Sequence, residues 1–229
     1  MLMNWIDPYN LVLFDFDGLL VNSEQLHYEA YKQMCARRGF TMAWGFHHYA
    51  DIAHSSPEAL YKALQEEFPG LCEEGGWPAC YEEKQHIYQE LISDGKMGLM
   101  PGVEILLEYL AKKDVSRCVV TNSRRVQVEA ISQAIPALRT IPHFLTREDY
   151  SARKPAPDGY LLAIERYGND ASRIIGFEDT LIGVQSLSAT KRALPVLICE
   201  PRASKQAKAL FPNLLHYKSF LDIGDQLGS

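Results

Sequence analysis

Four short, continuously apolar runs, separated by longer stretches with helical periodicity, constrain the fold of this chain more than any other feature. Such a short apolar run is typical of a strand buried on both faces, and strands that alternate with helices form a parallel sheet covered on both sides. The predicted strands span residues 11–14, 117–120, 173–177 and 194–198, and the predicted helices between them span 103–111, 125–133, 158–167 and 180–189. The sequence therefore predicts an α/β fold of three layers around a parallel sheet.

The segment 23–95 breaks this alternation. It carries helical patterns over 24–38, 57–68 and 78–92 and no comparable apolar run. We therefore predict two domains: a core made of residues 1–22 and 96–229, and a helical cap domain of residues 23–95 inserted into it. Glycines and small polar residues at 22–23 and 95–98 are suited to act as hinges between the two domains.

The composition is that of an ordinary globular protein, with 47% hydrophobic and 23% charged residues. A net charge of -6 without a dense basic tract argues against a nucleic-acid partner. There is no apolar stretch long enough to cross a membrane, and residues 1–10 lack the pattern of a signal peptide. The five scattered cysteines are typical of reduced thiols, so we predict a cytoplasmic protein.

Polar residues directly follow the first predicted strand in the order Asp15-Phe16-Asp17-Gly18. Two carboxylates at this spacing can divide the work of phosphoryl transfer: Asp15 attacks phosphorus, and Asp17 handles the proton of the leaving group. Gly18 allows the loop to turn sharply and lets a ligand approach the backbone closely.

The later strands end in further polar clusters, which should converge with the first because ligands sit at the carboxyl ends of strands in an open α/β sheet. Thr121 and Asn122 offer a hydroxyl and an amide to a phosphoryl oxygen, and Lys154 offers a compact positive charge. Glu178 and Asp179 add oxygen ligands for a metal. We expect a Mg²⁺ site formed by Asp15, Asp179 and the backbone carbonyl of Asp17, with Glu178 beside them.

These motifs together resemble the haloacid dehalogenase superfamily, in the branch with a helical cap that includes beta-phosphoglucomutase and phosphoglycolate phosphatase-like enzymes. The residues that carry the resemblance occur in the family's order and run over nearly the whole chain: Asp15-Phe16-Asp17-Gly18-Leu19-Leu20, Thr121-Asn122, Lys154 within Arg153-Lys154-Pro155-Ala156-Pro157-Asp158, and Gly176-Phe177-Glu178-Asp179-Thr180. The resemblance implies a Rossmann-like core, an aspartyl-phosphate on Asp15, and Asp17 as general acid and then base. It also makes dehalogenation improbable, because dehalogenating members lack the second aspartate.

Several histidines and arginines allow both a functional and a purely structural interpretation. His27 lies where relatives often carry a histidine facing the active site, yet it could equally pack within its own helix. His47, His48 and His54 are more typical of a hydrated cap surface than of a metal site. Arg124 and Arg125 could reach an anionic substrate, although a solvated helix start is the simpler interpretation.

The predicted function is that of a Mg²⁺-dependent phosphatase of a small phosphorylated metabolite. The main alternative is a phosphosugar mutase, which needs a cationic group in the cap to hold the second phosphate. The corresponding loop, 51–58, has no arginine or lysine, although Lys62 or Lys84 could substitute. A noncatalytic binding module is disfavoured because it has no need of Asp15 and Asp17 together. Neither the substrate nor the oligomeric state can be read from the sequence.

Overall fold

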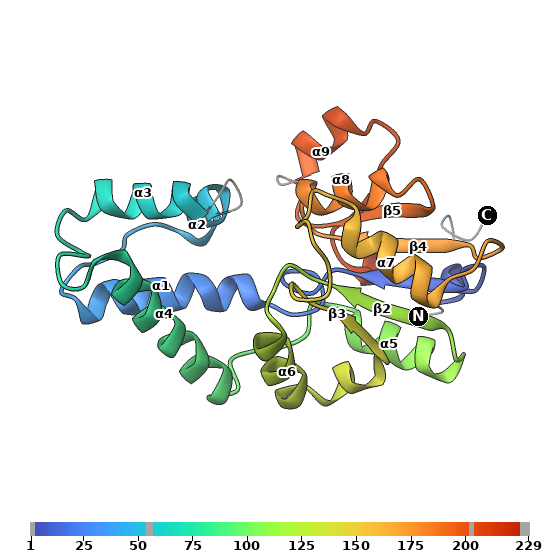
Figure 1. Cartoon of the computed structure of the whole chain (residues 1–229), viewed down its shortest axis with the longest axis horizontal. Helices are drawn as coiled ribbons and strands as arrows, with labels where there is room; N and C mark the ends of the chain where they lie inside the picture. Colours follow the sequence, from blue (N-terminus) through green and yellow to red (C-terminus); the bar gives the residue numbers. More distant parts are fainter. Residues whose placement is uncertain (1–2, 54–56, 202–203, 225–229) are drawn as a thin grey trace. The chain divides into compact units, whose positions relative to one another are not determined.

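The computed structural model describes residues 3–53, 57–201 and 204–224. The chain forms two compact units, here called the sheet unit and the helical unit (Figure 1). The sheet unit comprises Met1–Val21 and Gly98–Ser229, and the helical unit comprises Asn22–Met97. That these units act as a catalytic core and a cap, with the boundaries expected from the sequence, stays a prediction.

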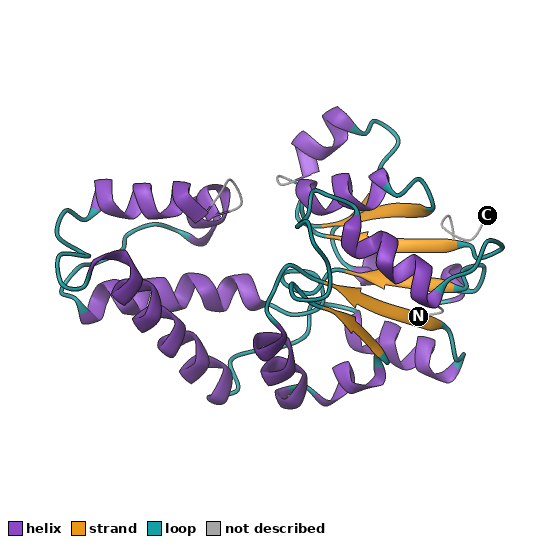
Figure 2. Cartoon of the chain, in the orientation of Figure 1, coloured by secondary structure: helices purple, strands orange, loops and turns teal. Residues whose placement is uncertain are grey.

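The sheet unit is built on a parallel sheet, whose strands are orange in Figure 2. Within the described residues this sheet has six strands, in the order β3-β2-β1-β4-β5-β6. The predicted α/β fold with a parallel sheet is therefore confirmed. The strand that precedes the insertion, β1, lies in the interior of the sheet, between β2 and β4. The strands are β1 (Leu11–Phe14), β2 (Ser116–Val120), β3 (His143–Leu145), β4 (Ile174–Glu178), β5 (Ala193–Ile198) and β6 (Leu215–Tyr217).

All four residues of β1 are buried. Since successive side chains of a strand point to opposite faces, both faces of β1 are covered. On one face, Leu11 and Leu13 belong to an apolar cluster with Tyr160 and Ala163 of helix α7. On the other face, Phe14 stacks on Phe177 of β4 and meets Phe220 edge-on, with ring centroids 5.7 and 6.3 Å apart. This two-sided burial explains why the strand is a continuous apolar run.

The helices between the strands agree with the predicted ones to within one or two residues at each end. The helix α7 begins and ends at the predicted residues, whereas α8 starts one residue later because Thr180 is its N-cap: the Thr180 side chain accepts a hydrogen bond from Gly183 N. The helices of the sheet unit are α5 (Val103–Lys112), α6 (Arg125–Ala134), α7 (Asp158–Tyr167), α8 (Leu181–Ala189) and α9 (Ser204–Leu210), with short 3₁₀ turns η1 (Asn4–Ile6), η2 (Pro136–Thr140) and η3 (Phe220–Asp222).

The helical unit holds α1 (Ser23–Arg37), α2 (Phe46–Ala53), α3 (Pro57–Glu67) and α4 (Gly76–Ser93). The helices α1 and α4 pack together, and aromatic side chains fill the space around them: Tyr31 lies parallel to Trp77, and Tyr49 is buried against Tyr28 and Tyr31. The core of the helical unit is therefore largely aromatic. In the part of the chain that the structure describes, no helix is long and apolar enough to cross a membrane.

Candidate active site

The first polar cluster lies at the carboxyl end of β1. The backbone N–H of Asp15 donates to Phe177 O at 3.0 Å, which continues the ladder with β4 one residue beyond the strand. The chain then turns tightly, with Gly18 N donating to Val21 O at 2.9 Å. Gly18 has φ +80°, a conformation that residues with a side chain rarely adopt, so the glycine is required by the turn.

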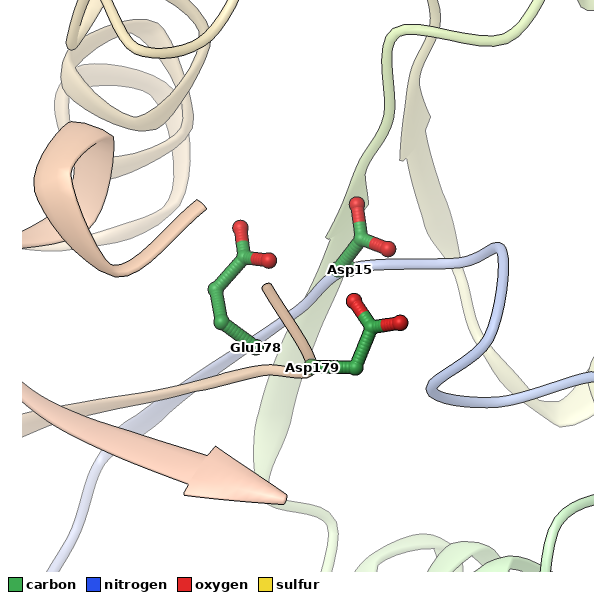
Figure 3. Close-up of side chains that lie close together, drawn as sticks. All are labelled: Asp15, Glu178 and Asp179. Carbon is green, nitrogen blue, oxygen red and sulfur yellow. The ribbon is translucent and has the colours of Figure 1, made fainter. Parts of the chain in front are cut away.

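The carboxylates of Asp15, Glu178 and Asp179 converge at the ends of β1 and β4, as Figure 3 shows. Each offers one oxygen, and these three oxygens lie within 4.8 Å of one another. Asp15 and Glu178 are buried, and Asp179 is partly exposed. The pairing of β1 with β4 brings these residues together although most of the chain separates them.

Lys154 lies against this cluster. Its ammonium donates a hydrogen bond to Asp15 Oδ1 and another, at 2.8 Å, to Glu178 Oε1. Tyr160, in the first turn of α7, also donates from its hydroxyl to Glu178 Oε1. Lys154 is therefore a buried cation held between two carboxylates, and not a solvated lysine in a proline-rich loop.

Burial raises the pKa of Asp15 to about 8, and the negative charges of Glu178 and Asp17 add to this rise while Lys154 opposes it. Burial alone lowers the pKa of Lys154, but Asp15 and Glu178 outweigh that effect and raise it above its ordinary value. Among the described residues, three carboxylates, those of Asp15, Asp17 and Glu178, thus act on this cluster against the single cation Lys154. A further positive charge is therefore favoured here.

The loop after β2 supplies hydroxyl groups. Thr121 Oγ1 lies 3.3 Å from Asp17 Oδ2, and Ser123 Oγ donates to the same oxygen at 2.5 Å. The hydroxyl of Tyr150 donates to Thr121 O at 2.5 Å and thereby fixes the backbone at the end of β2. Asn122 Oδ1 accepts from the backbone N–H of Lys154 at 3.2 Å, so Asn122 joins this loop to the loop that carries Lys154.

The donor set fits a magnesium ion. Mg²⁺ prefers carboxylate and carbonyl oxygens, and one or two carboxylates with substrate oxygens and water are enough to hold it. The second oxygen of Glu178, Oε2, is buried and accepts no hydrogen bond within the described residues. A buried carboxylate oxygen without a proton donor is costly unless a cation faces it.

His27 lies in the helical unit, on α1. Its Nδ1 is 2.7 Å from Lys84 Nζ of α4, and its ring stacks on Tyr88 with centroids 4.0 Å apart. Burial, together with the positive charge of Lys84, holds the pKa of His27 well below its ordinary value, so the ring is neutral and its Nδ1 accepts a hydrogen bond from the ammonium. Both contacts are made inside the helical unit, and a role of His27 in phosphate binding stays a prediction. His54 lies outside the described residues.

Three residues of this site were missed by sequence reasoning: Ser123, Tyr150 and Tyr160. Each donates a hydroxyl hydrogen bond to a group at a strand end. For Ser123, its position two residues after Thr121 was a usable signal. Tyr150 and Tyr160 gave none, because an isolated tyrosine near a loop or in a helix is ordinary.

Comparisons with known proteins show what this chain resembles as a whole. Residues 12–194 match the family model described as haloacid dehalogenase-like hydrolase. Protein CbbY of Rhodobacter capsulatus is 27% identical over 182 residues, which are 78% of this chain and 80% of that protein. The (DL)-glycerol-3-phosphatase 2 of Arabidopsis thaliana is 27% identical over 198 residues, which are 83% of this chain and 80% of that protein. The crystal structure of CbbY from Rhodobacter sphaeroides in complex with phosphate has the same fold, with a TM-score of 0.72 at 20% identity, covering 94% of this chain and 96% of that one.

Proposed function

The chain belongs to the haloacid dehalogenase-like hydrolases, and from this premise we propose that it is a Mg²⁺-dependent phosphatase of a small phosphorylated metabolite. The observation that carries the proposal is the convergence of a buried lysine and three carboxylates at the ends of β1 and β4. A phosphoryl group is anionic, and a reaction that brings it to a carboxylate needs cations at the point of attack. The similarity to the (DL)-glycerol-3-phosphatase 2 of Arabidopsis thaliana supports the same substrate class.

Asp15 is the proposed nucleophile. One oxygen, Oδ1, accepts the hydrogen bond from Lys154, which fixes the carboxylate and leaves the other oxygen to attack phosphorus. Its backbone is held by the ladder bond to Phe177 O, so the attacking group sits on a rigid element. The product of this step is an aspartyl-phosphate.

Asp17 is the proposed general acid and base. It first gives a proton to the oxygen of the leaving alcohol, and it then takes a proton from the water that attacks the aspartyl-phosphate. Thr121 Oγ1 and the Asn122 amide are the proposed hydrogen-bond donors to the phosphoryl oxygens, and Lys154 neutralises part of their charge. Gly18 keeps the loop between Asp17 and Val21 tight and lets substrate approach the backbone.

Asp15 and Asp179, with the backbone carbonyl of Asp17 and support from Glu178, are the residues that would hold Mg²⁺. A metal ion there supplies positive charge between an anionic nucleophile and an anionic substrate. Asp15 and Glu178 are both buried, so bulk water solvates their charges poorly and a cation between them is favoured.

Release of phosphate from p-nitrophenyl phosphate, measured with and without Mg²⁺, tests the proposal. We expect turnover that depends on the metal and is lost on chelation. If the purified protein releases no phosphate from this substrate or from a broad panel of phosphorylated metabolites, the proposal is wrong. The same panel identifies the preferred substrate.

The acceptor of the phosphoryl group is proposed to be water and not a second sugar hydroxyl. The experiment is incubation with beta-glucose 1-phosphate and a trace of the 1,6-bisphosphate. A phosphatase releases phosphate faster than it forms glucose 6-phosphate. The opposite order of rates establishes a mutase.

A further inference from the structure

The carboxylate of Asp17 is held asymmetrically. Its oxygen Oδ2 accepts two hydroxyl hydrogen bonds, from Ser123 Oγ at 2.5 Å and from Thr121 Oγ1 at 3.3 Å. Its other oxygen, Oδ1, is buried and accepts no hydrogen bond within the described residues. When Asp17 carries a proton, that proton therefore resides on Oδ1, because hydrogen-bond donors already occupy Oδ2.

Ser123 and Thr121 are not equivalent donors. The backbone N–H of Ser123 donates to Thr121 Oγ1 at 3.0 Å, so one acceptor position of that hydroxyl is already used. A hydroxyl has a single proton to give. If Thr121 gives its proton to a phosphoryl oxygen, it cannot give the same proton to Asp17. Ser123 then remains as the hydroxyl that holds Asp17 while substrate is bound.

The position of Ser123 is itself well defined. It lies between the end of β2 and the start of α6, and its carbonyl oxygen accepts from the backbone N–H of Arg147 at 2.9 Å. Its N–H is bonded to Thr121, as described above. Because the backbone N–H and C=O of Ser123 are both hydrogen-bonded, its side chain can orient Asp17 with little loss of conformational entropy.

We propose that Ser123 is a positioning residue for proton transfer: its hydroxyl holds Oδ2 of Asp17, so that Oδ1 is the oxygen left to exchange a proton with the leaving group. This inference rests on the proposed phosphatase function. In the first step, an Asp15 oxygen forms a bond to phosphorus and the bond from phosphorus to the ester oxygen breaks. The electron pair stays on that oxygen, which takes the proton from Asp17.

In the second step, Asp17 takes a proton from water while the water oxygen bonds to phosphorus. The bond between phosphorus and Asp15 breaks, and inorganic phosphate leaves. Both steps need Asp17 in the same orientation. Ser123 touches neither phosphorus nor the leaving group in this scheme and acts only through Asp17.

Such a role predicts an effect that depends on the leaving group. Phenyl phosphate and p-nitrophenyl phosphate have nearly the same shape, but p-nitrophenolate is a stable anion and leaves without a proton. Phenolate is a poorer leaving group and gains more from a correctly placed acid. The value of kcat/KM for each substrate reports the first step alone, up to departure of the leaving group.

The experiment compares Ser123→Thr with Ser123→Val, two side chains of the same shape that differ by the hydroxyl. With saturating Mg²⁺, we expect Ser123→Val to lower kcat/KM for phenyl phosphate roughly tenfold more than for p-nitrophenyl phosphate, since a misplaced catalytic group costs up to about a hundredfold. Ser123→Thr should stay within about threefold of wild type on both substrates. Ser151→Ala, an exposed serine of the same unit, is the control.

Equal losses on the two substrates for Ser123→Val overturn the inference, because a merely structural defect does not distinguish leaving groups. Equal activity of the Thr and Val variants overturns it as well. The proposed function fails in a different way: wild-type protein then releases no phosphate from either substrate. Thermal unfolding of each variant shows that the pair is compared in the folded state.

Discussion

Gly183 lies directly beneath the carboxylate of Glu178: a Cβ atom placed on Gly183 would come within 1.8 Å of Glu178 Oε2. Gly183 is in the first turn of α8, and Glu178 is the last residue of β4. The tight connection from strand to helix brings the two together. The absence of a side chain at position 183 therefore makes room for one of the carboxylates of the candidate metal site.

Replacing Gly183 by alanine tests this relationship. In an ordinary helix this change stabilises a protein by up to about 1 kcal/mol. Here we expect the opposite sign, a loss of about 1–3 kcal/mol from overpacking, together with a higher Mg²⁺ concentration for half-maximal activity because Glu178 is displaced. Urea unfolding and Mg²⁺ titration of activity measure the two effects. Gly224→Ala, where a Cβ meets nothing within 4 Å, is the control.

Asp15→Asn should abolish turnover and preserve the fold. The amide has nearly the same shape as the carboxylate but cannot form the aspartyl-phosphate. Phosphate release should fall by more than about a thousandfold. Retention of more than about 1% of wild-type turnover argues against Asp15 as the nucleophile. Asp114→Asn, a surface change of the same type, should keep full activity.

Asp179→Ala should raise the Mg²⁺ concentration needed for half-maximal activity by about tenfold or more, because it removes a carboxylate from the proposed metal ligands. The measurement is a Mg²⁺ titration of phosphate release at fixed substrate. Asp170→Ala is the matched control, since Asp170 is fully exposed and its contact with Arg192 is 3.9 Å long. A titration curve for Asp179→Ala that coincides with the wild-type curve contradicts the assignment.

The stability of the sheet unit should depend on pH through Asp149. Partial burial alone raises the pKa of Asp149, but hydrogen bonds from Thr146 and the charge of Arg125 outweigh it, so the pKa lies below its ordinary value. Thr146 N and Arg125 Nη2 each donate to this carboxylate at 2.7 Å. A carboxyl with a lowered pKa in the folded state stabilises the protein above its unfolded pKa, and this stabilisation is lost as pH falls through the folded value.

Asp149→Asn should therefore lower the free energy of unfolding by about 2 kcal/mol at pH 7, where the wild-type carboxylate is charged. The difference between variant and wild type should shrink towards zero in acid, once the pH has fallen through the lowered folded pKa of Asp149. Urea unfolding at the two pH values measures it. A difference that persists unchanged in acid shows that the contribution comes from packing and not from the charge.

The sequence predicted those parts of the fold whose pattern is local. Each predicted strand is buried along most of its length. A run such as Leu11–Phe14, which is apolar at every position, fits a strand buried on both faces and not an amphipathic element with one polar face. The short strands β3 and β6 were missed because they are only three residues long and partly exposed, as at His143 and His216, so no apolar run marks them. The helix α2 was missed because it offers a single buried residue, Tyr49.

The residues of the candidate site also fall into those that the sequence predicted and those that it did not. Asp15, Lys154 and Glu178 were identified from motifs, and the structure brings them into contact. The support around them could not be foreseen, because it depends on which loops pack together in three dimensions. Ser123 reaches Asp17 only because the parallel pairing of β1 and β2 aligns the ends of the two strands. Tyr160 is a helix residue whose partner is fixed by the packing of α7 on the sheet.

The interior position of β1 also has a consequence for how the chain is made. Its two neighbours, β2 and β4, both lie beyond the helical unit in the sequence. During synthesis the N-terminus emerges first, so Leu11–Phe14 leaves the ribosome as an apolar segment with no strand to pair with. The helical unit is contiguous and is complete before either neighbour exists. The ladder bond that anchors Asp15 forms only after Phe177 has been added. A chain interrupted before Ser116 therefore carries Asp15 at the end of an unpaired strand, the kind of edge from which aggregation begins.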